Sequence, residues 1–198
     1  MSTAEKLNLI SVEDYLAGEL NSPVKHEYLG GFVYAMAGAR NAHNDIAGNI
    51  HGALYGRLRG KRCRAYTSDV KIRIRLAGHV RFYYPDDSVS CHPNPRDDSF
   101  QDEPDVIFEV LSPATRRIDQ GEKKDAYLTI PSLKVYALVE QDTPAVTVFR
   151  RTESGFVREV YQGLGAVIPL SEVGIELPLA EIYEDTELVP EEKPPEER

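Results

Sequence analysis

The sequence predicts one domain of mixed α-helical and β-strand structure, on three observations. In residues 42–59, apolar side chains recur every four residues, as on an amphipathic helix that packs one face on a sheet. In residues 66–76, apolar and basic side chains alternate, which indicates a half-buried strand. Residues 105–111, D-V-I-F-E-V-L, are mostly β-branched or aromatic and lie between turn residues, which is typical of a buried core strand.

Length and composition are those of an ordinary soluble domain. The chain has 198 residues, of which 41% are hydrophobic and 28% charged, so it can form one core but is too short for two. No apolar run approaches the roughly 20 residues that span a bilayer, and no basic region precedes a long apolar segment at the N-terminus. We therefore expect a cytoplasmic protein, in which Cys63 and Cys91 are free thiols rather than a disulfide.

The N-terminal part predicts a helix, a hairpin and a second helix. After a lead-in of residues 1–10, the pattern S-x-x-D at residues 11–14 resembles a capping box that opens a helix to about residue 20. Gly30 and Gly31 then join K-H-E-Y-L to F-V-Y-A-M, as in a β-hairpin whose first arm holds Glu27. The buried positions expected on the second helix are Ile46, Ile50, Leu54 and Leu58.

The middle of the chain predicts two antiparallel strands and a loop. The strand at residues 66–76 is followed by a partner strand at residues 80–90. Pro85 cannot donate a ladder hydrogen bond, so this partner is expected at a sheet edge or bulged just before Asp86. Residues 92–103 are polar and rich in turn formers, and they are expected to form a loop before the buried core strand.

The C-terminal part predicts a helix and further strands, which complete a domain of residues 11–183. Asp119 followed by Glu122 resembles a capping box that starts a helix ending near residue 129. The other expected elements are a strand at residues 133–139, a hairpin of 146–150 and 156–161, a strand at 167–170 and a short amphipathic segment at 180–183.

Charge is distributed unevenly along the chain. The net charge is −9, yet residues 57–81 hold nine basic residues and one acidic residue, which gives this segment a charge of +8. Phosphate binding requires lysine and arginine, so the strand face formed by Lys71, Arg73 and Arg75 is the expected nucleic-acid contact. An ordinary solvated strand face is the alternative. Residues 184–198 contain seven acidic residues, two basic residues and three prolines, and we expect this tail to be disordered.

Three carboxylates, Glu27, Asp86 and Glu109, lie at predicted strand positions where a solvated loop does not explain them. An ionised Glu109 in an apolar strand costs several kcal/mol unless a cation or hydrogen bonds compensate it. Magnesium usually binds one or two carboxylates together with waters and a substrate phosphate, so Asp86 and Glu109 on neighbouring strands could form its site. Such a cation activates water and neutralises charge on phosphorus.

Each carboxylate also has an ordinary structural explanation. Glu109 could form a buried ion pair with an arginine such as Arg116 or Arg117. Asp86 could be a turn residue after proline, with Asp87 as its competitor for the site. Glu27 could be an ordinary solvent-facing glutamate on the arm of the hairpin.

Several motifs accompany these carboxylates. They are Pro85-Asp86 with E-V-L at residues 109–111, H-E-Y-L-G-G-F-V-Y-A-M with the later His43, and D-x-x-x-K-x-x-x-Y at residues 119–127. Together they resemble the PD-(D/E)xK nuclease superfamily and, more closely, the Uma-type restriction endonuclease family, over about residues 10–183. The resemblance implies a restriction-endonuclease-like core, which is a mixed β-sheet flanked by helices, with added β-hairpins.

The resemblance also assigns roles by position: Asp86 and Glu109 as metal ligands, Glu27 as an additional acidic residue and Lys123 as the catalytic lysine. The superfamily places its lysine two residues after the glutamate, where this chain has Leu111. The resemblance therefore moves the ammonium to the following helix, where Lys124 is the alternative to Lys123. His43 is expected to be a structural or capping residue.

The leading hypothesis is an Mg²⁺- or Mn²⁺-dependent endonuclease that hydrolyses phosphodiester bonds of DNA. One alternative is a non-catalytic nucleic-acid-binding or protein-binding module on the same fold, and another is a hydrolase of RNA or of another phosphate ester. Analogy with nucleases that cut two strands predicts a symmetric homodimer. No membrane partner is expected.

Overall fold

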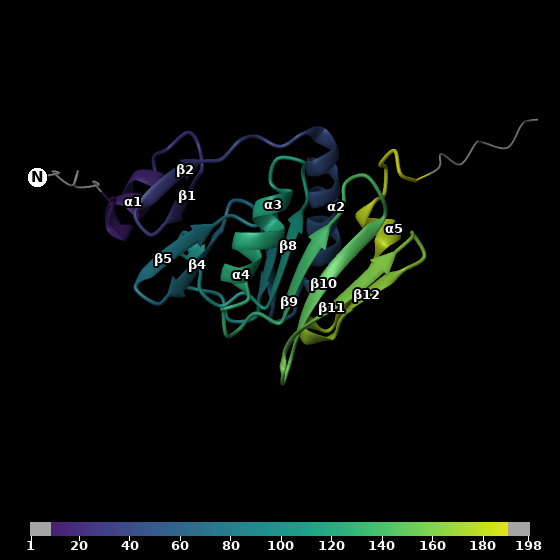
Figure 1. The fold of residues 1–198 in the computed structure, drawn as a ribbon. Coiled ribbons are helices and arrows are strands. Elements are labelled where there is room, and N and C mark those ends of the chain that lie inside the picture. Colours follow the sequence, from purple (N-terminus) through teal and green to yellow (C-terminus); the bar gives the residue numbers. More distant parts are fainter. Residues whose placement is uncertain (1–8, 190–198) are drawn as a thin grey trace, which may run out of the picture.

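Two large β-sheets, a small two-stranded sheet and the helices around them make up the computed structural model, which describes residues 9–189 (Figure 1). Most of the expected N-terminal lead-in and most of the acidic tail lie outside the described residues. Within residues 9–189, no helix is both long enough and apolar enough to cross a bilayer. The mixed α/β fold class predicted from the sequence is confirmed, with sheets flanked by helices.

The first sheet has five strands in the order β2-β1-β5-β4-β7, and all of its pairs except β4 with β7 are antiparallel. Its first two strands are the predicted hairpin, in which Gly30 and Gly31 adopt positive φ angles of 60° and 106°. The strands are β1 (His26–Leu29), β2 (Phe32–Ala35), β4 (Lys71–Leu76), β5 (His79–Tyr83) and β7 (Phe100–Gln101).

The second sheet has six strands in the order β11-β10-β9-β8-β6-β3, with β8 and β9 parallel. A separate pair, β12 and β13, lies beside it. The strands are β3 (Arg64–Thr67), β6 (Asp87–Ser90), β8 (Val106–Val110), β9 (Val135–Val139), β10 (Ala145–Thr152), β11 (Gly155–Gln162), β12 (Val167–Leu170) and β13 (Ile175–Pro178).

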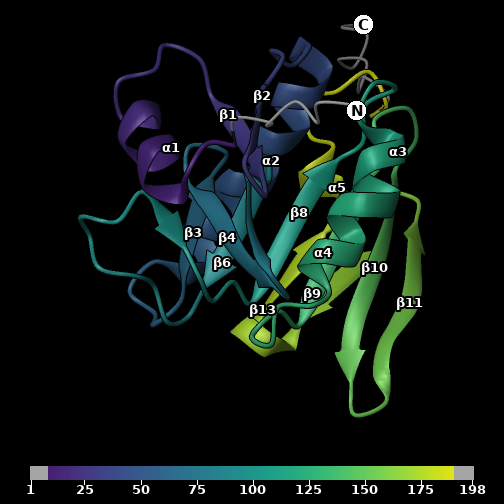
Figure 2. The same ribbon diagram turned by 60° about the vertical axis from the view of Figure 1, so that its left-hand side comes forward.

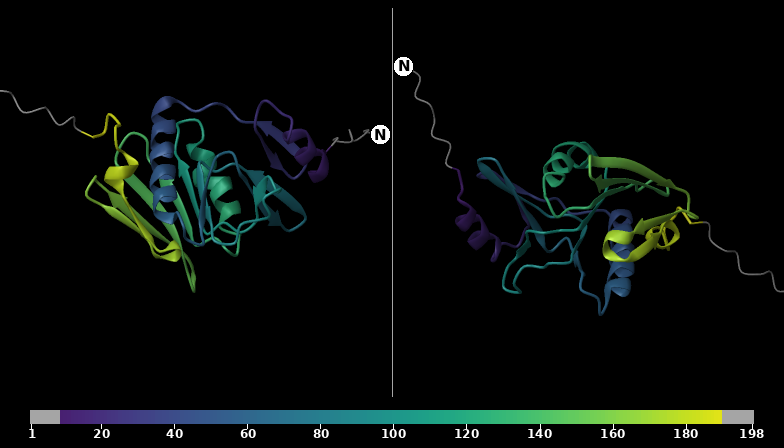
Figure 3. Two further views of the ribbon diagram at one scale, coloured as in Figure 1. Left: turned by 180° about the vertical axis from the view of Figure 1, so that it is seen from behind. Right: turned by 90° about the horizontal axis from the view of Figure 1, so that it is seen from below.

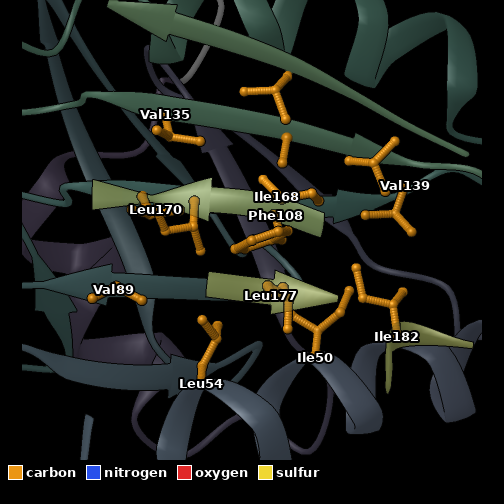
Figure 4. Packing of buried hydrophobic residues seen from close by; sticks show 14 of the residues in the cluster. Ile50, Leu54, Val89, Phe108, Val135, Val139, Ile168, Leu170, Leu177 and Ile182 are labelled. Carbon is orange, nitrogen blue, oxygen red and sulfur yellow. The ribbon is translucent and has the colours of Figure 1, made fainter. Parts of the chain in front are cut away.

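Helices cover both faces of the six-stranded sheet. On one face, α2 packs with β12, β13 and α5 around Ile50, Phe108 and Leu177 (Figures 3 and 4). On the other face lie α3, η1 and α4, in front of β8 and β9 in Figure 2. The helical segments are α1 (Val12–Glu19), α2 (Asn41–Leu58), α3 (Arg116–Ile118), η1 (Asp119–Lys123, a π-helical turn), α4 (Lys124–Tyr127), η2 (Ser171–Val173) and α5 (Leu179–Ile182).

Helices α1 and α2 confirm their sequence patterns. The hydroxyl oxygen of Ser11 accepts a hydrogen bond from the backbone N–H of Asp14, 3.0 Å away, as expected of the N-terminal cap of α1. The four apolar positions predicted on α2 are all buried against the sheet. Helix α1 in turn covers the five-stranded sheet, where Tyr15 packs against Tyr28 and Phe82.

Two predicted strands are each divided between the two sheets. The predicted strand of residues 66–76 is β3 followed by β4, separated by a turn in which the Val70 N–H donates to the Thr67 carbonyl. The predicted strand of residues 80–90 is β5 followed by β6, and the break falls at Pro85, which cannot donate to a ladder. The predicted antiparallel pairing is correct for β4 with β5.

Other boundaries also differ from the prediction. The expected loop of residues 92–103 contains β7, and β13 was not predicted. The predicted helix start at Asp119 is wrong, because the helical segment begins at Arg116. The first hydrogen bonds of this segment run from the backbone N–H of Arg116 to the carbonyl of Ser112 and from the N–H of Asp119 to the carbonyl of Thr115.

Cys63 and Cys91 form a disulfide, so the prediction of free thiols is wrong. The antiparallel register pairs Arg64 of β3 with Ser90 of β6, and continuing it by one residue sets the two cysteines opposite each other. The prediction considered the cellular compartment but not strand pairing. The disulfide links β3 and β6 at the edge of the six-stranded sheet.

Candidate active site

Lys123 lies at the centre of a cluster of carboxylates between the two sheets. Its Nζ is 2.9 Å from Glu27 Oε1, 3.6 Å from Glu109 Oε1 and 3.6 Å from Asp119 Oδ1. Only 8% of its side chain is exposed. Burial alone would lower the pKa of Lys123, but the three carboxylates outweigh it and raise the pKa above its ordinary value. One ammonium therefore forms ion pairs with carboxylates from β1, β8 and η1.

Glu109 supplies a buried carboxylate from strand β8 of the six-stranded sheet. Alternation along the strand predicts that Glu109 and Phe108 point to opposite faces, and in the structure Glu109 points toward α4 and Phe108 toward α2. Burial raises the pKa of Glu109 well above its ordinary value, although the Lys123 ammonium opposes the change. Its Oε1 atom accepts no hydrogen bond from the residues that the structure describes. The same Oε1 atom lies 3.6 Å from Lys123 Nζ, so a further ligand would share it with the ammonium.

Asp86 lies where the chain crosses from the five-stranded to the six-stranded sheet. The register of β6 against β8, continued by one residue, sets Asp86 opposite Glu109. The N–H of Val110 donates a 2.7 Å hydrogen bond to Asp86 Oδ2, and His43 Nε2 lies 2.9 Å from Asp86 Oδ1. These contacts fix the carboxylate beside Glu109.

His43 contacts the site, although the sequence predicted only a structural or capping role. It lies in the first turn of α2, and Gln141 Nε2 lies 3.3 Å from its Nδ1. Burial lowers the pKa of His43, but the hydrogen bond with Asp86 and the charge of Asp86 outweigh burial, so the pKa is raised. A pairing between residues 43 positions apart leaves no local pattern in the sequence.

Asp119 is a site residue that sequence reasoning missed. It was assigned as a helix cap, yet it is buried within η1, and burial raises its pKa against the opposing charge of Lys123. The hydroxyl of Tyr136 donates a 2.9 Å hydrogen bond to its backbone carbonyl and so holds this turn. The spacing D-x-x-x-K of Asp119 and Lys123 was the available signal, because residues four apart share one helix face.

Other cations considered for the site lie elsewhere. Lys124 Nζ is 5.4 Å from the centre of the Phe149 ring and 3.5 Å from Asp125 Oδ1. Arg116, one proposed partner of the buried glutamate, forms two hydrogen bonds with Glu140 instead. Of the two lysines left open by the sequence, the structure brings Lys123 to the carboxylates.

A divalent cation would find suitable oxygen ligands here but no ready-made cage. Within residues 9–189, no three side chains of the His, Cys, Asp and Glu types are grouped so as to hold a metal ion. The ammonium of Lys123 lies among the carboxylates instead. Magnesium needs only one or two carboxylates besides waters and phosphate. Glu109 and Asp86, which lie opposite each other, fit that requirement, although Glu109 Oε1 also contacts Lys123.

The predicted basic surface lies on the opposite face of the five-stranded sheet from Glu27. Strand pairing sets Lys71, Arg73 and Arg75 on the face that packs against α1, whereas Glu27 is on the face toward α4. Lys71 is buried over two tyrosine rings, and burial lowers its pKa. Arg73 and Arg75 both pair with Asp102, at 2.7 Å and 2.9 Å. Their contact with nucleic acid stays a prediction.

A second histidine–aspartate pair joins α2 to β6. Asp87 Oδ1 lies 2.8 Å from His51 Nδ1, on the α2 side of the sheet, so Asp87 does not compete with Asp86 for the cluster around Lys123. Burial raises the pKa of Asp87 to about 7, with the hydrogen bond to His51 opposing it. That hydrogen bond outweighs burial at His51 and raises its pKa.

Replacing Lys123 by methionine is expected to destabilise the protein. The change leaves buried carboxylates without their cation, and breaking a buried ion pair costs about 3–5 kcal/mol. Urea unfolding measures the loss. The matched control is Lys124→Met, for which we expect a loss of less than about 1 kcal/mol, because Lys124 pairs with the exposed Asp125 at 3.5 Å and such pairs contribute little. Equal losses at both lysines would contradict the assigned cluster.

The stability contributed by Asp87 is expected to depend on pH. Its folded pKa of about 7 exceeds its ordinary value of 3.8, so between these values the folded state holds a proton that the unfolded state has released. This contribution is complete below about pH 4 and is lost as the pH rises through 7. Urea unfolding from pH 5 to 8 should therefore show a steeper fall for wild type than for Asp87→Asn, with the exposed Asp97→Asn behaving as wild type. Parallel curves for wild type and Asp87→Asn would show that titration of Asp87 does not cause the fall in stability.

The sequence and the fold both match known proteins. Residues 12–180 match the family Uma2, which is described as "Putative restriction endonuclease". Two uncharacterized proteins of Synechocystis sp. are similar in sequence. One, slr1290, is 33% identical over 147 residues, which are 74% of this chain and 76% of that protein. The other, sll1609, is 28% identical over 144 residues, which are 71% and 80% of the two chains.

A solved structure shows the same fold. It is titled as a putative nuclease belonging to DUF820 from Anabaena variabilis, and it superposes with a TM-score of 0.67 at 19% identity, covering 84% of this chain and 96% of that one. The matched range contains Lys123 and all the carboxylates described around it, which are Glu27, Asp86, Glu109 and Asp119. The chain therefore belongs to the family Uma2.

Proposed function

We propose that this protein is a metal-dependent endonuclease that hydrolyses DNA, with Asp86 and Glu109 as ligands of Mg²⁺ or Mn²⁺. One observation carries the proposal: a buried ammonium is surrounded by carboxylates from three separate elements, in a chain of a restriction endonuclease family. Burying charged groups costs free energy, and such groups gather at functional sites. This cluster is therefore the strongest candidate site of the described chain.

The protein's own residues prepare the ligand oxygens. The Val110 amide and His43 each hold one oxygen of Asp86, and the central strand fixes Glu109 opposite. A bound divalent cation would supply Lewis acidity, which polarises a phosphate and acidifies a water. Burial raises the pKa of Glu109. A cation bound beside it would oppose this effect, because a nearby positive charge favours the ionised carboxylate.

Lys123 is proposed to stabilise negative charge that develops on the phosphate. Its raised pKa keeps the ammonium charged at neutral pH, and its Nζ lies 2.9 Å from Glu27 Oε1. Its distances to Glu109 Oε1 and Asp119 Oδ1 are longer, at 3.6 Å each. This arrangement replaces the lysine that the superfamily carries two residues after the glutamate, where Leu111 packs in the core.

Phosphates near the site would need cations on the same side. Arg40 and Arg117 are both exposed, and each lies close in sequence to a residue of the site, three residues before His43 and two before Asp119. They are the candidates for backbone contacts at the scissile bond. The basic strand on the other sheet face could contact only a more distant part of a long substrate.

The same proposal includes a symmetric homodimer, because one site cuts one strand and a two-fold pair would cut both strands of a duplex. It also includes a cytoplasmic location, where chromosomal DNA lies. The Cys63–Cys91 disulfide argues against that location, because reducing compartments keep thiols reduced.

A non-catalytic module on the same fold is the second candidate. It is favoured by the ammonium of Lys123, which already compensates the carboxylates without a metal. Calorimetry with Mn²⁺ separates the two candidates, since the nuclease predicts heat of binding that Asp86→Asn removes. Salt-sensitive DNA binding without any Mn²⁺ heat would favour the module.

Cleavage of labelled single-stranded and plasmid DNA tests the nuclease directly. We expect activity with Mg²⁺ or Mn²⁺ that EDTA abolishes, and Asp86→Asn and Glu109→Gln at the EDTA background, because each amide lacks the ligand charge. Lys123→Met should lower the rate on the order of 10²–10³-fold, as when one charge-stabilising donor is removed.

Lys124→Met is the control for these variants and should cleave as wild type, because its side chain lies over Phe149. Metal-independent cleavage would contradict the proposal, and so would no cleavage with any divalent cation.

A further inference from the structure

Two aromatic side chains are left exposed on the edge strand β2. Phe32 is 44% exposed and Tyr34 is 54% exposed, whereas Tyr28 and Phe82 on the neighbouring strands are buried. Residues two apart on a strand project to the same face, so the two exposed rings lie side by side on one surface of the hairpin. Figure 1 shows β2 at the outer side of its sheet, next to β1.

This aromatic pair shares its sheet face with the candidate site. In the antiparallel register Tyr34 lies opposite Glu27, and Phe32 lies opposite Leu29, so all four side chains are on the same face. Glu27 is the residue that contacts Lys123 at 2.9 Å. The exposed rings therefore stand one strand away from the carboxylate cluster.

The other face of the hairpin is already filled. Tyr28 and its cross-strand partner Val33 pack there with Tyr15 of α1. On the site face, Leu29 packs with the core beneath α4, but Phe32 and Tyr34 extend beyond that core. The fold thus leaves aromatic surface open only where the hairpin borders the site, among the described residues of β1 and β2.

We infer that Phe32 and Tyr34 form a stacking platform for unpaired nucleobases, so that the site takes a single-stranded DNA segment. The inference rests on the proposed nuclease function. An aromatic ring stacks on the flat face of any base, and these faces are open in a single strand but covered by neighbours in a duplex. Arg40, exposed at the N-terminal end of α2 and three residues before His43 of the site, is a positive charge for the phosphate backbone.

A tryptophan reporter tests the stacking contact. The chain contains no tryptophan, so Tyr34→Trp introduces one indole, and Tyr55→Trp on α2 is the matched control because Tyr55 is 58% exposed. Both full-length variants are titrated with a single-stranded 12-nucleotide DNA in EDTA, which prevents cleavage. We expect quenching of the indole at position 34, none at position 55, and weaker quenching by the corresponding duplex. Equal responses at the two positions would overturn the inference.

Affinity provides a second readout that does not depend on a new side chain. Phe32→Leu and Tyr34→Leu are each expected to weaken single-strand binding by about 5- to 150-fold, the range that loss of one stacked base produces. Tyr55→Leu should bind as wild type. Mn²⁺ binding by calorimetry should stay unchanged in all three variants, because none of these residues is a proposed ligand.

The outcomes separate the platform from the nuclease. Quenching at position 34 without any cleavage by wild type would keep the platform and reject the nuclease. Cleavage and binding that are insensitive to Phe32→Leu and Tyr34→Leu would keep the nuclease and reject the platform. If these variants instead change only the sedimentation of the protein, the exposed rings are a protein interface and the inference is wrong.

Discussion

The ion cluster around Lys123 is the interaction on which the site depends. Glu109 and Asp119 are buried where an ionised carboxylate would be unstable alone, and like charges nearby make their ionisation costlier still. One ammonium compensates them, and by doing so it ties β1, β8 and η1 together. The cluster is therefore both a structural bond between the two sheets and a preorganised set of charges. A cation that binds Glu109 must compete with Lys123 for the same oxygen, so stability and metal affinity are coupled.

The chain reaches this arrangement by changing sheets next to Pro85. Strand β5 belongs to one sheet and β6 to the other, and Asp86 lies at the crossing, opposite Glu109. A proline at this point ends one ladder without leaving an N–H unpaired. The carboxylate is thereby placed between the sheets, where carboxylates from both of them converge. The aromatic edge of β2 extends the same face outward, so ligand oxygens and stacking surface would act on one substrate strand.

Sequence reasoning succeeded where a pattern is local and long. The helix carrying Ile46 to Leu58, the glycine turn of the hairpin and the two faces of the strand around Glu109 all follow from periodicity, and the structure confirms them. It failed where the outcome depends on pairing between distant segments. Alternation shows that a strand has two faces, but not which sheet it joins. The strand through Thr67 was therefore predicted as continuous, and the strand through Pro85 as an edge or bulged strand rather than as two strands in different sheets. The contact of His43 with Asp86 and the Cys63–Cys91 disulfide have the same origin, since both follow from strand and helix positions rather than from local sequence.

The most direct test of the account is a crystal structure of the protein grown with Mn²⁺ and measured for anomalous scattering. We predict one anomalous peak within coordination distance, about 2.0–2.1 Å as for the similar Mg²⁺ ion, of oxygens from Asp86 and Glu109. We also predict that Lys123 remains beside Glu27. The contradicting result is no peak at saturating Mn²⁺, with the ammonium still facing Glu27, Glu109 and Asp119 as it does without metal.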